Sequence, residues 1–113
     1  MDPVGIDAVE IWTGKLELDL PGTLAPAKDE DPDKYRKGIG IERSSFPDLY
    51  EDIVTMGANA AKRLMDRKNL TPEDIGRIDV ATESAFDNSK PVSTYVAGCL
   101  EQYFDGEFRH ANK

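Results

Sequence analysis

The sequence predicts an α/β fold, and three observations support this class. Short apolar or alternating segments typical of strands are interspersed with segments of helical periodicity. Proline and glycine stand at many of the boundaries between them. The 113 residues are enough for one domain or for part of a larger one. The expected order is strand, strand, helix, strand, helix, strand, which is typical of α/β proteins.

Two strands are expected near the N-terminus. Residues 4–12 are apolar and β-branched, which indicates a strand that is broken at Gly14. Residues 15–20 alternate strictly and place three leucines on one face, which predicts a half-buried strand. Proline and glycine at residues 21–22 then end it.

The next segment has little periodicity and is expected to be mostly loop. Residues 23–34 contain prolines and a run of acidic residues. They should lead into a short helix over residues 32–37, because proline is favoured in the first helical turn. Glycines at residues 38–40 are expected to close this helix. Residues 44–47 are predicted to be another loop.

Residues 51–68 carry the clearest helical pattern. Small residues at Gly57, Ala58 and Ala61 would allow a neighbouring element to pack closely. Acidic residues at the start and basic residues at the end complement the helix dipole, and Asn69 is the expected stop. The predicted buried face consists of Ile53, Met56, Ala60, Leu64 and Met65.

The second half of the chain predicts alternating elements. Residues 71–74 resemble a helical turn with threonine as its N-cap. A short strand is expected over residues 77–81, followed by a polar turn-rich segment over residues 82–90. A second helix should begin at a proline and cover residues 91–103, and residues 107–110 are predicted to start a last strand.

The composition excludes several kinds of partner. There are 22 acidic and 14 basic residues, giving a net charge of −8, which argues against binding nucleic acid or an anionic membrane surface. A single cysteine, Cys99, allows no disulfide within the chain and fits a reducing compartment. The N-terminus lacks an apolar signal region, so a cytoplasmic protein is expected. The acidic surface would also suit a high-salt cytoplasm.

The strongest motif spans residues 79–92, D-V-A-T-E-S-A-F-D-N-S-K-P-V. Here a predicted strand delivers Glu83 to its carboxyl end, just before the second helix. Ligands and catalytic groups collect at such strand ends in α/β sheets. From spacing alone, an ordinary surface carboxylate is the simpler interpretation of Glu83.

This segment resembles the motif of the hydroxymethylglutaryl-CoA synthases, in which a strand, T-E-S or T-E-T, D-x-S-K and a helix follow in that order. K-Y-R-K-G-I-G at residues 34–40 is similar to the family's K-Y-x-x-G-L-G. E-D-I-V-T-M at residues 51–56 is similar to its E-D-I-x-S/T-L/M helix start. Residues 64–70 followed by 75–78 also match. The resemblance runs from about Val4 to the end of the chain.

The resemblance implies a thiolase-like fold of layered αβαβα architecture. Residues 1–113 would be the N-terminal portion of the first thiolase-like domain. It also implies an acyltransferase that condenses acetyl-CoA with acetoacetyl-CoA to hydroxymethylglutaryl-CoA, in the mevalonate pathway of isoprenoid synthesis. CoA thioesters are the substrates, and no cofactor or metal is expected. A homodimer, a complex with acetoacetyl-CoA thiolase and an archaeal host are further expectations.

By motif match, Glu83 is the base that removes a methyl proton from the acetyl-enzyme, and a dry pocket would strengthen it. Asp31 and Pro32 align with a position that touches the CoA ester, with a helix-start loop as the alternative. The basic residues within 34–37 could meet CoA phosphates, but a solvated face is the favoured interpretation.

The nucleophilic cysteine of this family lies on a strand-to-helix turn with the pattern A-C-x-G/A-G-T. Cys99 lies within an apolar helix and is predicted to be a buried, inert thiol. The nucleophile is therefore expected beyond Lys113, so that the chain would be truncated before it and inactive alone. An alternative places Asn112 at its position, giving a dead enzyme. His110 is predicted to lie at a strand end near the site entrance.

Two rival interpretations remain at the level of sequence. One is another thiolase-fold enzyme, such as an initiating ketoacyl-acyl carrier protein synthase, which typically lacks the segment around Glu83. The other is a non-catalytic acidic interaction module. In either case, apolar sheet and helix faces are expected to stay uncovered, which would make the isolated chain prone to aggregate.

Overall fold

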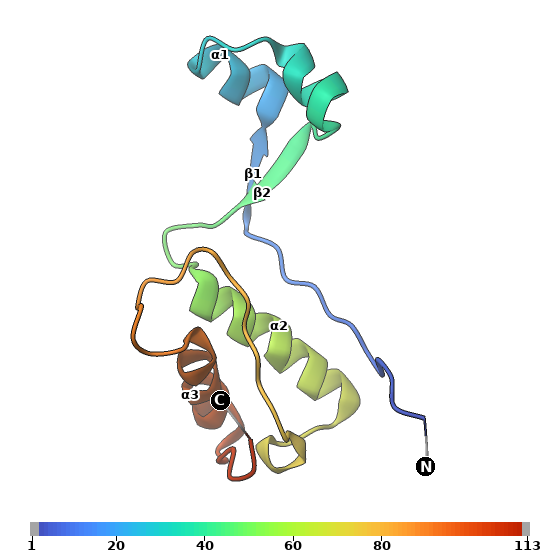
Figure 1. Cartoon of the computed structure of the whole chain (residues 1–113), viewed down its shortest axis with the longest axis vertical. Helices are drawn as coiled ribbons and strands as arrows, with labels where there is room; N and C mark the ends of the chain where they lie inside the picture. Colours follow the sequence, from blue (N-terminus) through green and yellow to red (C-terminus); the bar gives the residue numbers. More distant parts are fainter. Residues whose placement is uncertain (1–2, 112–113) are drawn as a thin grey trace. The chain divides into compact units, whose positions relative to one another are not determined.

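The computed structural model describes residues 3–111, and its chain forms two compact units (Figure 1). The hairpin unit consists of residues 13–51. The helix-pair unit consists of residues 3–12 and 52–111. Each unit is described by itself below. No helix among the described residues is long and apolar enough to cross a membrane.

The hairpin unit is built on a two-stranded antiparallel sheet. Strand β1 (Leu16–Asp19) confirms the strand predicted over residues 15–20, and Leu16 lies opposite Phe46 in the register. Its partner β2 (Arg43–Phe46) overlaps the loop predicted over residues 44–47, so that prediction was wrong. Serine and arginine show no apolar alternation. Residues 43–46 are extended because the backbone of β1 supplies their ladder of hydrogen bonds.

The connection between the two strands is largely helical. It contains η1 (Leu20–Leu24), α1 (Ala25–Ala27) and η2 (Lys34–Ile39), of which η2 confirms the short predicted helix. The helical turns over residues 20–27 were not predicted. They are stabilised by the Asp19 carboxylate, which accepts the Gly22 N–H at 2.8 Å, and by complete burial of Ala25. Gly40 ends η2 at a φ of 75°, a conformation that glycine adopts without steric cost.

The helix-pair unit contains α2 (Ile53–Lys68) and α3 (Val92–Phe104), and both confirm helices predicted from the sequence. Helix α2 begins at Asp52, whose carboxylate accepts the Thr55 N–H at 2.7 Å while the Thr55 hydroxyl accepts the Asp52 N–H at 2.8 Å. It ends at Asn69, which has a φ of 53°, as predicted. The short helix η3 (Pro72–Asp74) confirms the capped turn, because the Asp74 carboxylate accepts the Thr71 N–H.

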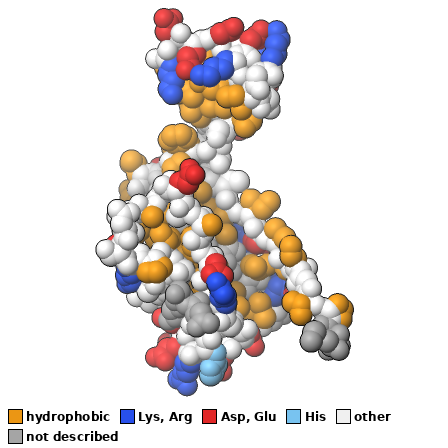
Figure 2. Space-filling model, viewed as in Figure 1, with side chains coloured by type: hydrophobic (Ala, Val, Ile, Leu, Met, Phe, Trp, Pro, Cys, Tyr) orange, Lys and Arg blue, Asp and Glu red, His pale blue; other side chains and the backbone are white. Residues whose placement is uncertain are grey.

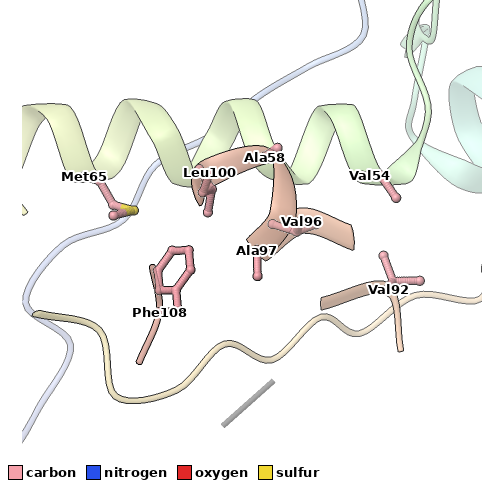
Figure 3. Close-up of a cluster of buried hydrophobic side chains, with 8 residues drawn as sticks. All are labelled: Val54, Ala58, Met65, Val92, Val96, Ala97, Leu100 and Phe108. Atoms are coloured by element: carbon pink, nitrogen blue, oxygen red, sulfur yellow. The ribbon is translucent and has the colours of Figure 1, made fainter. Parts of the chain in front are cut away.

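The core of this unit lies between the two helices. A Cβ added at Gly57 would lie 3.4 Å from the Val96 side chain, which confirms that the small residues of α2 allow close packing. The predicted buried face of α2 was only partly right. Met65 is buried, but Val54 and Ala58 are buried in place of the other predicted positions. The buried cluster consists of Val54, Ala58, Met65, Val92, Val96, Ala97, Leu100 and Phe108 (Figure 3).

The strands predicted over residues 4–12, 77–81 and 107–110 are not formed in the described part of the chain. Residues 77–81 contain only an isolated bridge position, and the Ile78 and Val80 side chains pack on the core. The backbone N–H and C=O groups of a strand need hydrogen-bond partners on a neighbouring strand. The β-propensity of a segment is not sufficient to form a strand without such a neighbour. Among the described residues, β1 and β2 are the only strands that pair.

The N-terminal segment is instead held to α2 by arginine side chains. Arg67 donates to the Val9 carbonyl oxygen at 2.7 Å, and Arg63 donates to the Ile11 carbonyl oxygen at 3.3 Å. Arg67 also pairs with Glu10 at 3.3 Å. Guanidinium groups therefore satisfy carbonyl groups that a sheet neighbour would otherwise satisfy.

Candidate functional site

Glu83 lies in a loop, residues 82–90, that joins the core-packed segment before it to α3. Its side chain is exposed, and no hydrogen bond or ion pair links it to any of residues 3–111. The expected strand end and dry pocket are not formed around Glu83 by the described residues. The Glu83 carboxylate therefore faces solvent, and the shape of the loop that carries it is determined by other side chains of the loop.

Asp87 organises this loop through three hydrogen bonds. One carboxylate oxygen accepts the N–H groups of Ser89 at 2.8 Å and Lys90 at 3.1 Å. The other accepts the Tyr95 hydroxyl at 2.7 Å. The Ser89 backbone bond, followed by the bond from Tyr95, lowers the pKa of Asp87. The same carboxylate raises the pKa of Tyr95, because it stabilises the protonated phenol.

In the sequence, Asp87 stood out only as the first residue of the D-x-S-K motif, with no role assigned to it, and Tyr95 was not singled out. A recognisable signal was present, because an aspartate two residues before a serine, with a helix following, is typical of a side chain that caps its own turn. The partner on α3 could not have been read from this pattern. It depends on how the loop folds back over the first turns of the helix.

Tyr95 is also surrounded by side chains of the same loop. The Phe86 ring lies 5.0 Å from the Tyr95 ring, at an interplanar angle of 54°. The Lys90 ammonium lies 4.2 Å from the centre of the Tyr95 ring, which is within cation–π distance. Residues on both sides of Asp87 therefore contact one tyrosine.

An open cavity of about 260 Å³ lies along the loop. Thr82 lines it, and the Thr82 hydroxyl accepts the Ser84 N–H at 3.0 Å. Glu83 is not among its lining residues. The cavity is smaller than the pockets of about 300 Å³ or more that hold drug-sized ligands. The other lining residues are Val80, Ala85, Asp87, Asn88, Ser89, Lys90, Pro91 and Val92.

Asp31 and Pro32 belong to the hairpin unit, whereas Glu83 belongs to the helix-pair unit. The Asp31 carboxylate is exposed and accepts the Asp33 N–H at 2.9 Å, and Pro32 is half-buried at the start of the helical turn. This is the geometry of a helix-start loop, the alternative interpretation of the two residues. In this geometry the Asp31 side chain is exposed to solvent.

The basic residues of η2 are mostly engaged with acidic neighbours. Lys34 pairs with Glu30 at 2.8 Å, and Lys37 pairs with Asp33 at 2.5 Å, both one helical turn apart. Glu30 also accepts the hydroxyl of the buried Tyr35. The hydrogen bond that Lys34 donates to Glu30 raises the pKa of Lys34. These pairs fit the solvated face favoured from the sequence.

The remaining candidate residues, Cys99 and His110, give two corrections. Cys99 is exposed on α3, so the prediction of a buried thiol was wrong. Its neighbours Ala97 and Leu100 face the core, and the helical rotation turns residue 99 to solvent. His110 is exposed in a bend rather than at a strand end, and Asn112 lies outside the described residues. Within residues 3–111, no three His, Cys, Asp or Glu side chains gather as metal ligands would.

Comparison with known proteins places this chain in a family. The family described as "Hydroxymethylglutaryl-coenzyme A synthase N terminal" matches residues 1–108. A hydroxymethylglutaryl-CoA synthase of Haloferax volcanii is 80% identical over all 113 residues, which cover 25% of that relative. The cytoplasmic hydroxymethylglutaryl-CoA synthase of Homo sapiens is 34% identical over 99 residues, covering 88% of this chain and 19% of the relative.

Solved structures agree with the sequence comparison. MvaS in complex with 3-hydroxy-3-methylglutaryl coenzyme A is 37% identical, with a TM-score of 0.76 over 86% of this chain and 23% of that one. An HMG-CoA synthase complexed with CoA has a TM-score of 0.75 at 29% identity, covering 95% of this chain and 26% of that one. The thiolase-like fold class is thereby confirmed. The chain spans about a quarter of the length of such relatives. It belongs to the hydroxymethylglutaryl-CoA synthase family, whose N-terminal portion it matches.

Proposed function

We propose that the protein containing this chain is a hydroxymethylglutaryl-CoA synthase, an acyltransferase that condenses acetyl-CoA with acetoacetyl-CoA to give hydroxymethylglutaryl-CoA and CoA. The observation that supports this is the 80% identity with the Haloferax volcanii synthase across every residue of the chain. Residues 1–113 would form the N-terminal portion of its first thiolase-like domain. The proposed product would enter the mevalonate pathway.

Glu83 is the proposed general base of this reaction. A methyl group beside a thioester is a weak carbon acid, so its proton must pass to a base held next to it. The Glu83 carboxylate would take that proton, and the electron pair left on carbon would attack the ketone carbon of acetoacetyl-CoA. The acetyl group would by then be a thioester on a cysteine that had displaced CoA from acetyl-CoA, and the ketone oxygen would take up a proton after the attack. Hydrolysis of that thioester would then release hydroxymethylglutaryl-CoA and free the cysteine thiol. Exclusion of water when substrate binds would remove the solvent shell of the Glu83 carboxylate and make it a stronger base.

Asp31 and Pro32 are proposed to contact the CoA thioester. The solved relatives described above contain 3-hydroxy-3-methylglutaryl coenzyme A and CoA, so the family binds ligands of this class. In the hairpin unit the Asp31 carboxylate is exposed and therefore accessible to a ligand. A homodimer, a complex with acetoacetyl-CoA thiolase, a cytoplasmic location and an archaeal host all stay predictions.

The test is an assay of the complete protein encoded by the gene that contains this chain. Release of CoA from acetyl-CoA and acetoacetyl-CoA should be measured for the wild type and for Glu83→Gln, which keeps the shape but removes the base. The activity of Glu83→Gln should fall by at least about 10²-fold, the lower end of the range for general-base catalysis. Glu73→Gln is the matched control, because Glu73 is also exposed and lies in η3 of the same unit.

Two outcomes would contradict the proposal. Condensation that survives Glu83→Gln would remove Glu83 as the base. A wild-type protein that binds neither substrate and releases no CoA would favour the non-catalytic interaction module, and Glu83 would then be an ordinary surface carboxylate.

A further inference from the structure

Tyr95 is fixed firmly at the junction of the loop and α3. It lies in the first turns of the helix, and its half-buried ring packs against the core cluster. Val92 and Val96, on the same helix, are only 6% and 2% exposed. Their burial holds this end of α3 in place, so a group bonded to the Tyr95 hydroxyl is bonded to the rigid part of the unit.

The loop has few other anchors. No helix or strand is formed between residues 82 and 90. The hydrogen bond that the Ser84 N–H donates to the Thr82 hydroxyl lies within the loop and does not tie it to α3. Among residues 3–111, Asp87 is the side chain that joins loop backbone groups to α3, since it accepts two backbone N–H groups and the Tyr95 hydroxyl. A charged acceptor makes these bonds stronger than neutral ones.

We infer that Tyr95 is a positioning residue, which through Asp87 holds residues 82–90, and with them Glu83, in one arrangement. Glu83 lies four residues before Asp87 and has no side-chain partner of its own among residues 3–111, so the loop backbone sets where its carboxylate lies. For a base, this placement matters, because a displacement of about 1 Å can cost about 10²-fold in rate. What Glu83 does rests on the proposed function, whereas the anchoring of the loop does not.

The test compares Tyr95→Phe with Tyr103→Phe in the complete protein. Tyr95→Phe removes the hydroxyl but keeps the ring that contacts Phe86 and Lys90. Tyr103 is the matched control on the same helix, because its hydroxyl faces Asp66 on α2, at 3.5 Å, and not the loop. Amide hydrogen exchange of Ser89 and Lys90 should quicken about tenfold in Tyr95→Phe, the size expected for losing one bond to a charged group. In Tyr103→Phe it should stay at the wild-type rate.

A double-mutant cycle with Asp87→Asn tests whether Tyr95 acts through Asp87. Both single substitutions should quicken the exchange, and the double substitution should add little to the larger of the two effects. Additive effects would overturn the inference, as would unchanged exchange in Tyr95→Phe. Both outcomes can be read even if the protein has no synthase activity, so this test is separate from that of the proposed function.

In the active enzyme, the same substitution should change the chemical step rather than binding. We expect kcat of Tyr95→Phe to fall about tenfold or more while KM for acetyl-CoA stays within about twofold, because a misplaced base slows proton transfer without removing substrate contacts. Quickened exchange with an unchanged kcat would show that the loop is anchored by Tyr95 but that Glu83 does not depend on it, which would overturn the positioning role.

Discussion

At the scale of single residues, a few polar side chains determine where the elements begin and how the loop is shaped. Asp52 is the N-cap of α2, and Thr71 and Asp74 form a capping box at the start of η3. The Asp87 carboxylate stabilises a turn over residues 87–90. In each case a carboxylate accepts a nearby backbone N–H that a helix or turn would otherwise leave unpaired. Such contacts connect neighbours in sequence, so they are accessible to sequence analysis.

Replacing Asp52 with alanine should destabilise α2. The Thr55 N–H would lose its acceptor, which typically costs about 1 kcal/mol in the free energy of unfolding. The measurement is thermal unfolding followed by circular dichroism. Asp79→Ala is the matched control, because Asp79 pairs with Arg77 at the surface, where both side chains are 71% exposed. The control should keep the wild-type midpoint, and equal losses in the two variants would contradict the capping role.

The contribution of Asp52 should also depend on pH. The hydrogen bond from the Thr55 backbone lowers the pKa of Asp52 in the folded chain. Its stabilisation is therefore fully present above the unfolded carboxyl pKa of about 3.9, and it is lost as the pH falls through the lower folded value. The stability difference between wild type and Asp52→Ala should shrink in acid. A difference that stays constant from neutral pH to well below pH 3.9 would exclude this charge-dependent contribution.

At the scale of elements, helices and strands behaved differently. Helices α2 and α3 formed as predicted, since their hydrogen bonds lie within one segment. Residues 4–12 had a clear strand pattern, but they form no strand within the part of the chain that the structure describes. The Val9 and Ile11 carbonyl groups accept hydrogen bonds from arginines of α2 instead. Residues 43–46 had no strand pattern, yet they pair with β1. A strand is a property of two segments, so the pattern of one is not sufficient.

The contact between α2 and α3 should depend on the small size of Gly57. A leucine there would meet Val96, against which even a Cβ lies at 3.4 Å, and should lower the free energy of unfolding by about 1–3 kcal/mol. Gly98→Ala is the opposing control, because a Cβ on that α3 glycine meets nothing within 4 Å. It should raise stability by up to about 1 kcal/mol through helix propensity. Chemical denaturation measures the free energy of unfolding of both variants. An unchanged free energy in Gly57→Leu would mean that α2 and α3 move apart at little cost.

At the scale of the whole molecule, each unit leaves large apolar side chains exposed (Figure 2). Val4 and Ile6 in the helix-pair unit are 98% and 88% exposed, and Leu49 and Tyr50 in the hairpin unit are 94% and 86% exposed. Exposed apolar side chains were expected, but these four lie outside the strands and helices rather than on sheet or helix faces. Exposed surfaces of this kind mark contacts with other protein or a tendency to aggregate.

Self-association of the isolated chain should therefore increase with salt. The net charge of −8 makes copies repel one another at low ionic strength. Raising the salt from about 0.01 M to about 1 M shortens the screening length from about 30 Å to about 3 Å, so the exposed apolar side chains can meet. Light scattering measures this, and Ile6→Ser with Val4→Ser should reduce it. Association that decreases as salt is added would show that ion pairs, not apolar contacts, join the copies.

Part of the candidate site could be read from the sequence. The T-E-S and D-N-S-K motif placed Glu83 before a helix, and that helix is present. The contact of Asp87 with Tyr95 and the exposure of Cys99 were not foreseen. The first depends on how the loop returns to α3. The second depends on which side of α3 meets α2, and an apolar sequence around a cysteine does not specify that side.

The sequence alone was sufficient for the family, for both long helices and for the end of α2 at Asn69. These features depend on residue order and on contacts within one or two turns. The buried face of α2, the pairing of β2 and the surroundings of Tyr95 required the folded chain. They arise where segments distant in sequence meet, because backbone pairing and side-chain burial are satisfied by whichever partner the fold brings close.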